Sequence, residues 1–270
     1  MQSILFWSAT TLYALATVAF FAWASFGRER GADAGRALLG LALLPHAGSL
    51  ALRWAEVGHG PYNTRYEVVS ADTFLLVAVF LVAAALARGL RGLGVLVAPA
   101  ALLLMGWAVT NFGLKREVPI IFKSWWLVLH IGFAKLFFAT ILLAAFSAGA
   151  YLVKVRDPAA LPRLPSAERL DLYGHQLTLV SFLFLGVMIV AGSLWAQQSW
   201  GRYWGWDPME TSALVTWIVF GIVLHFRVLH RWSGRRMAWL TFVALAFAVV
   251  TLFVVAIAAP TIHNSYMVGS

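Results

Sequence analysis

The sequence of 270 residues contains no cysteine. Without a thiol the chain cannot form a disulfide bond, bind a metal through thiolate or supply a thiol nucleophile of its own. Any ligand to a metal or to haem iron must therefore be a histidine, a methionine or a carboxylate.

Charged residues are also scarce. They make up 11% of the chain, whereas 61% of the residues are hydrophobic, and soluble globular domains carry about a quarter of charged residues. This composition excludes an ordinary soluble domain and predicts a membrane protein with several spans. The net charge of +9 bears mainly on orientation in a membrane, so it is a poor argument for nucleic-acid binding.

In place of charged residues, the chain contains long apolar runs. A spanning helix needs about 20 apolar residues, and eight stretches qualify: 4–26, 37–55, 71–88, 93–111, 126–152, 175–197, 212–230 and 237–258. No repeat or separate soluble domain is visible, and the longest polar connection, 154–172, contains three prolines and reads as an extended linker. We therefore expect an all-α integral membrane protein, a single polytopic domain over residues 1–270 with a bundle of about eight transmembrane helices.

The basic residues predict the orientation of these helices. Alternate connections hold thirteen of them: Arg28, Arg30, Arg36, Arg88, Arg91, Lys154, Arg156, Arg163, Arg169, Arg227, Arg231, Arg235 and Arg236. The opposite connections hold six: Arg53, Arg65, Lys115, Arg116, Lys123 and Arg202. Because basic loops stay on the cytoplasmic side, both termini are expected on the outer face.

A tryptophan-rich segment, residues 195–211, joins the sixth and seventh spans on that outer face. Trp200, Tyr203, Trp204 and Trp206 provide a broad apolar aromatic surface suited to a flat macrocycle. Aromatic residues also gather at membrane interfaces simply as anchors. The run from Asp207 to Glu210 is in addition a good helix start, with Asp as N-cap, Pro at the first position and Glu three residues after the cap.

Two histidines are expected on the same face as this segment. His130 begins the fifth span, and His263 follows the eighth. Taken singly, His130 is more typical of an interhelical hydrogen bond than of a ligand, and His263 alone says less. Together they bracket the aromatic surface, and two imidazoles could hold a six-coordinate haem iron there.

His225 lies past the middle of the seventh span, in the half of the bilayer expected to be inner. Ionisable residues at such depth are costly and usually functional. The side chain could ligate a second haem, donate a hydrogen bond or take up a proton. His46, inside the second span, is a weaker candidate for the same inner site.

The string from Trp195 to Thr211, followed by Thr216-Trp217 and Leu224-His225-Phe226-Arg227, resembles the WWD motif of the cytochrome c biogenesis family CcsA (ResC), the membrane core of the system II cytochrome c synthetase. The resemblance extends over most of the chain, in the same order: to Arg53-Trp54, Gly58-His59-Gly60-Pro61, Asn63, Tyr66-Glu67, Leu129-His130 and His263-Asn264-Ser265-Tyr266. The related CcmC and CcmF proteins share the WWD string. Pro208 and Glu210 disfavour CcmC, and the chain length disfavours CcmF.

The resemblance implies a haem-handling enzyme of the bacterial cytoplasmic membrane. Together with a partner called CcsB (ResB), the family carries haem b to the outer face and joins its vinyl groups to the thiols of a CXXCH motif in apocytochrome c. By position, His130 and His263 resemble the two external ligands of the iron, and His225 resembles the intramembrane ligand. Trp200, Trp204, Trp206 and Asp207 would position the ring, with Tyr203 beside them. The second inner ligand is attributed to the partner, which leaves His46 as a packing residue.

One departure from the family is Met209, where lysine is common, so a charge at this position has no counterpart here. Two other functions fit the same residues: a membrane b-type cytochrome that passes electrons between two haems, and a haem permease that makes no bond. Only a synthetase would leave haem on an apoprotein in a form that resists extraction with acid-acetone.

Overall fold

The computed structural model describes residues 1–28, 30–113 and 122–261 and divides into two compact units. The first comprises Met1–Glu117 and Val153–Arg169, and the second comprises Val118–Leu152 and Leu170–Ser270. Regular structure in the described ranges is helical throughout. Each unit is described by itself below.

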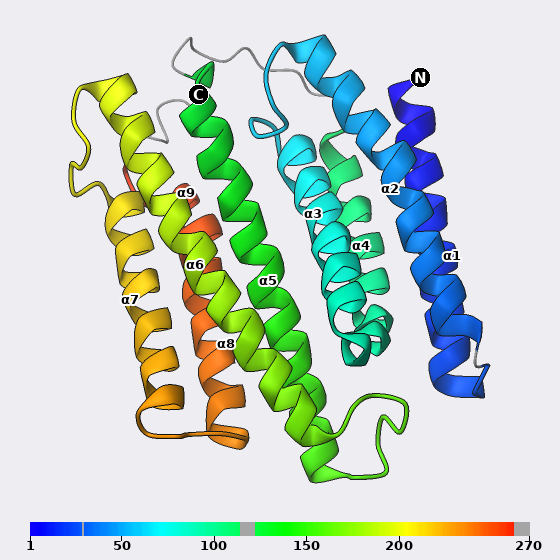
Figure 1. Cartoon of the computed structure of the whole chain (residues 1–270). Coiled ribbons are helices and arrows are strands. Elements are labelled where there is room, and N and C mark those ends of the chain that lie inside the picture. The colour runs from blue at the N-terminus through cyan, green and yellow to red at the C-terminus, as the bar shows by residue number, and fades with distance from the viewer. Residues whose placement is uncertain (29, 114–121, 262–270) are drawn as a thin grey trace. The chain divides into compact units, whose positions relative to one another are not determined.

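Within the described residues, eight helices are long and apolar enough to cross a membrane, which confirms the predicted all-α membrane fold (Figure 1). The first unit is built from α1 (Gln2–Phe26), α2 (Arg30–Val57), α3 (Arg65–Leu86), the 3₁₀ turn η1 (Arg88–Leu93), α4 (Gly94–Ala108) and η2 (Val109–Asn111). The second is built mainly from α5 (Trp125–Arg156), α6 (Ala167–Trp200), α7 (Pro208–Val228), α8 (Arg235–Val249), the π-helical turn η4 (Val250–Val254) and α9 (Val255–Ala258).

The linker predicted over 154–172 is shorter than expected, because α5 continues to Arg156 and α6 starts at Ala167. Basic residues in the last turn of a helix and acidic ones in the first turn complement the helix dipole. Lys154 and Arg156 end α5 in this way, and Glu168 begins α6. These polar turns extend the helices beyond the apolar run that the sequence marks.

Small residues let α1 pack closely on its neighbours. Its buried side chains alternate large and small at spacings of three and four residues: Phe6, Ala9, Tyr13, Ala16 and Phe20. The ring of Phe20 lies against two glycines, since a Cβ built on Gly35 of α2 would be 2.6 Å from it and one on Gly94 of α4 would be 2.0 Å from it. Helices in membranes associate through such close contacts at small residues.

Buried polar side chains connect α1, α2 and α3. His46 is fully buried, and its ring nitrogens lie 2.9 Å from the Tyr13 hydroxyl and 2.9 Å from the Ser70 hydroxyl. Both nitrogens therefore make hydrogen bonds that link three helices.

A buried ion pair closes the connection between α2 and α3. The Arg53 guanidinium donates to Glu67 at 2.8 Å, with both side chains almost fully buried. Glu67 also accepts hydrogen bonds from the backbone N–H groups of Asn63 and Thr64, and its own N–H donates to the Thr64 hydroxyl. This capping box fixes the start of α3.

In the second unit, aromatic and hydroxyl contacts join the helices. Phe182 of α6 stacks on Trp217 of α7 with ring centroids 4.9 Å apart. Phe137 of α5 meets Phe220 of α7 edge to face. Because hydroxyl groups in an apolar interior need partners, the 2.8 Å hydrogen bond from Ser181 of α6 to Thr140 of α5 adds a polar link between those helices.

The helix that follows the last basic loop is interrupted by the π-turn Val250–Val254. Thr251 in this turn donates to the backbone carbonyl of Ser212 at 3.1 Å, and its hydroxyl lies 2.7 Å from that of Thr216. Single π-turns inside helices occur often at functional sites, and this one ties η4 to the second and third turns of α7.

Candidate functional site: an aromatic pocket beside His130

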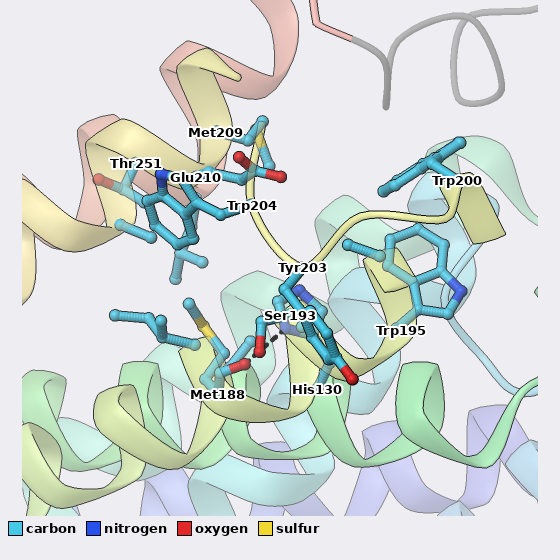
Figure 2. A pocket seen from close by; sticks show the side chains of 16 residues that line it. His130, Met188, Ser193, Trp195, Trp200, Tyr203, Trp204, Met209, Glu210 and Thr251 are labelled. Atoms are coloured by element: carbon cyan, nitrogen blue, oxygen red, sulfur yellow. Dashed lines mark hydrogen bonds between the residues drawn. The ribbon is translucent and has the colours of Figure 1, made fainter. Parts of the chain in front are cut away.

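One pocket in the second unit gathers residues from α5, α6, η4, α7 and the loop between α6 and α7. It holds about 630 Å³ of empty space, the part open to solvent included. Its lining is mainly apolar and aromatic: His130, Ala134, Met188, Ile189, Gly192, Ser193, Trp195, Ala196, Trp200, Tyr203, Trp204, Met209, Glu210, Ala213, Thr251 and Leu252. Figure 2 shows ten of these side chains with labels.

His130 occupies the second turn of α5, and α6 fixes its ring. The Nδ1 atom lies 2.8 Å from the backbone carbonyl oxygen of Met188 (Figure 2). A carbonyl oxygen only accepts, so Nδ1 carries the proton and the lone pair of the neutral imidazole is on Nε2. A carbonyl partner on one nitrogen of this kind sets the tautomer and orientation of many metal-binding histidines.

Two further residues of α6, Gly192 and Trp195, contact the His130 imidazole on the same helix face as Met188. A Cβ built on Gly192 would come within 2.7 Å of His130 Nδ1, so only glycine leaves room for the ring at its present position. The ring also stacks on Trp195, with centroids 6.4 Å apart and an angle of 21° between the planes. Met188, Gly192 and Trp195 are spaced by four and three residues, which places them on one helix face.

The loop that follows α6 is held by acidic side chains at the start of α7. Glu210 accepts hydrogen bonds from the N–H of Gly205 at 2.7 Å and from the N–H of Asp207 at 3.2 Å. Asp207 is buried and accepts from the N–H of Met209 at 2.9 Å. This capping box confirms the expected helix start at Asp207-Pro208-Met209-Glu210 and adds a function for Glu210, which ties the loop to the helix.

The aromatic residues of the loop take different places. Trp200, Tyr203 and Trp204 line the pocket, and Trp200 packs against Trp195 at 4.9 Å. Trp206 does not line it: its backbone has a φ of 56°, and 71% of the side chain is exposed. Its ring meets that of Trp204 edge to face, with centroids 5.8 Å apart.

The expected intramembrane ligand, His225, lies away from this pocket. His225 is in the last turn of α7, about 27 Å along the helix from Asp207 at 1.5 Å per residue. Its side chain is exposed, and its ring centroid is 5.8 Å from that of His230. His263 lies outside the described residues.

Three pocket residues were missing from the sequence-based site: Met188, Gly192 and Thr251. Trp195 was predicted only as the first residue of the tryptophan-rich segment. The spacing of Met188, Gly192 and Trp195 on α6 is visible in the sequence, but spacing alone does not say which partner the face meets. Thr251 depends on the π-turn, which no pattern of residues predicted.

The sequence from residue 54 to residue 263 matches the family described as Cytochrome C assembly protein. The chain belongs to this family. It is 30% identical to the cytochrome c biogenesis protein CcsA of Guillardia theta, over 74% of each chain. It is 29% identical to the CcsA protein of Gloeobacter violaceus, over 95% of this chain and 91% of that one. Membership confirms the resemblance to CcsA and assigns this integral membrane protein to cytochrome c biogenesis.

A solved structure, that of the cytochrome c haem lyase CcmF, has a similar fold. It superposes with a TM-score of 0.70 at 18% sequence identity, over 94% of this chain. The superposition covers 46% of CcmF, so this chain spans less than half the length of that protein. At this identity the likeness concerns the fold.

Proposed function

We propose that the chain holds haem b at the aromatic pocket, on the outer face of the bacterial cytoplasmic membrane, and presents it for covalent attachment to apocytochrome c. It would act as the CcsA subunit of a cytochrome c synthetase, with a CcsB-type partner. The observation that carries the proposal is the position of the His130 imidazole. Its Nδ1 proton is directed to the Met188 carbonyl, and the ring lines the same pocket as Trp195, Trp200 and Trp204.

The residues present suit haem as a substrate. A neutral imidazole with its lone pair on Nε2 is a common axial ligand to haem iron. Flat apolar side chains such as Trp200 and Trp204 suit the porphyrin face. His263 would supply the second external ligand, and this assignment rests on the family resemblance.

Attachment needs no nucleophile from this chain. Each CXXCH thiol adds across one haem vinyl group: a carbon–sulfur bond forms at the inner vinyl carbon, and the hydrogen of the thiol ends on the terminal carbon. The addition consumes no oxidant or reductant, provided that the thiols enter reduced. The contribution of the protein would be positioning, which in favourable cases lowers a barrier by about 7 to 11 kcal/mol.

Replacement of the ligand tests the proposal. His130→Ala should lose the haem absorption of the purified protein and regain it when imidazole is added. Co-expressed with a CXXCH apocytochrome and a CcsB-type partner, the same variant should yield little haem that resists acid-acetone. Wild-type haem content and cytochrome yield in this variant would refute the assignment. If the unaltered protein yields haem that resists extraction with acid-acetone, both alternative functions, the electron-transfer cytochrome and the haem permease, are excluded.

His225 is proposed as the ligand for haem that arrives from the inner side, with its second ligand supplied by the partner. The exposed position of the side chain near the end of α7 supports access from another chain. Absorption spectra of wild type and His225→Ala, each with and without the partner, test this. A partner-dependent haem band that persists unchanged in His225→Ala would exclude the assignment.

A further inference from the structure

A second pocket, in the first unit, is lined by four arginines. Arg88 and Arg91 come from η1, Arg163 from the connection between α5 and α6, and Arg169 from the first turn of α6. The pocket holds about 780 Å³ of empty space, the part open to solvent included. Among the described residues no aspartate or glutamate lines it.

The guanidinium groups differ in what they contact. Arg163 donates to the carbonyl of Ala24 at the end of α1, at 2.7 Å, and Arg91 donates a long 3.4 Å hydrogen bond to the carbonyl of Ala84. The side chains of Arg88 and Arg169 make no hydrogen bond or ion pair within the described parts of the chain. Like charges gathered in one pocket repel each other, and a bound anion would offset that repulsion.

The connection that carries Arg163 is fixed in place. Lys154 donates from Nζ to the carbonyl of Leu164 at 2.8 Å. Gly27 has a φ of 72°, and a Cβ built there would be 2.6 Å from the Arg163 guanidinium, so the side chain lies closely over this glycine. The Arg163 side chain is therefore in place before any ligand arrives, which lowers the entropic cost of binding.

The remaining lining is apolar and adjoins the ends of membrane helices. Trp23, Leu164 and Pro165 line the pocket beside the arginines. Phe26 at the end of α1 is 72% exposed, and Leu86 at the end of α3 is 85% exposed. An anion with an apolar tail suits this combination better than a free inorganic anion, because acyl chains could lie along the exposed side chains while the phosphate meets the arginines.

We infer that this pocket binds the phosphate headgroup of an anionic phospholipid. The lining residues lie in or beside three connections between helices that the distribution of basic residues assigns to the cytoplasmic side. Pockets rich in arginine and lysine between membrane helices on that side commonly bind anionic headgroups. The inference is independent of the haem function proposed above.

The test measures retained lipid. Wild type and two double variants would be incorporated into phosphatidylcholine bilayers with or without phosphatidylglycerol, purified in detergent and analysed by mass spectrometry for bound phosphatidylglycerol. Arg88→Gln with Arg169→Gln should retain roughly 20- to 30-fold less of it, at about fivefold for each charge. Arg156→Gln with Arg235→Gln removes the same charge from exposed positions outside the pocket and should retain the wild-type amount.

Two further arms separate the possible outcomes. Gly27→Ala keeps all four arginines but displaces Arg163, so it should also lower retention if the pocket geometry matters. Excess inorganic phosphate during purification should leave the lipid bound, and its release by phosphate alone would mean that the site takes a free anion. Equal retention in the two double variants would overturn the proposal.

Discussion

Gly192→Ala tests how the His130 imidazole is held. The added methyl group would lie 2.7 Å from Nδ1, so the ring must move and its hydrogen bond to the Met188 carbonyl must lengthen or break. Overpacking of this kind costs about 1 to 3 kcal/mol, and a lost hydrogen bond costs about 0.5 to 1.5 kcal/mol more. At about 1.4 kcal/mol for each tenfold change, haem affinity should fall roughly tenfold to a thousandfold.

Gly132→Ala is the matched control. Gly132 lies two residues after His130 in α5, and a Cβ built there meets no atom within 4 Å. Both alanines raise helix propensity by up to about 1 kcal/mol, so the difference between the variants isolates the contact with the imidazole. Titration of the purified proteins with haem, followed at the Soret band, measures the affinities. Equal haem affinity in the two variants would refute the proposal that Gly192 sets the position of the His130 ring.

Three further changes test the supports of the fold and the loop. Glu210→Ala leaves two loop N–H groups without their carboxylate, and each lost hydrogen bond to a charged group should destabilise the loop by about 1.5 to 3 kcal/mol. The haem content of the purified variant should therefore drop. Tryptophan fluorescence of the loop that is unchanged from wild type would contradict this. Glu67→Ala leaves a buried guanidinium without its carboxylate and should destabilise the protein by about 3 to 5 kcal/mol, seen as earlier thermal unfolding in detergent. In Gly35→Ala the added methyl group presses on the Phe20 ring and should lower the stability of the protein by about 1 to 3 kcal/mol. Gly106→Ala is the control, because a Cβ at Gly106 faces open space. Equal melting temperatures of the two variants would count against the contact between Gly35 and Phe20.

Much of the fold could be predicted because the bilayer restricts the possible structures. Apolar runs of about 20 residues give helices, and eight of them were found. The start of α7 was equally readable, since Asp207, Pro208 and Glu210 act within a single turn. Local chemistry of this kind needs no knowledge of neighbouring helices.

The parts of the site that could not be predicted depend on how the helices are rotated and packed. That His130 bonds to a carbonyl of α6, 58 residues later in the chain, follows from the packing of two helices whose apolar residues lie on every side. Trp206 was expected to face the ring together with Trp200 and Trp204. That role stays a prediction: the residue has a positive φ and its indole is mostly exposed, and no pattern of residue types indicates that conformation.

The π-turn at Val250–Val254 also has an evolutionary consequence. A widened turn accommodates one residue more than the regular helix, and each helical residue advances the chain by about 100°. Loss of a single amino acid there would restore a regular turn and leave the later side chains of that helix on the sides they now occupy. Homologues that lack the widened turn should therefore be one residue shorter at this place, and their aligned sequences should show no compensating length change nearby.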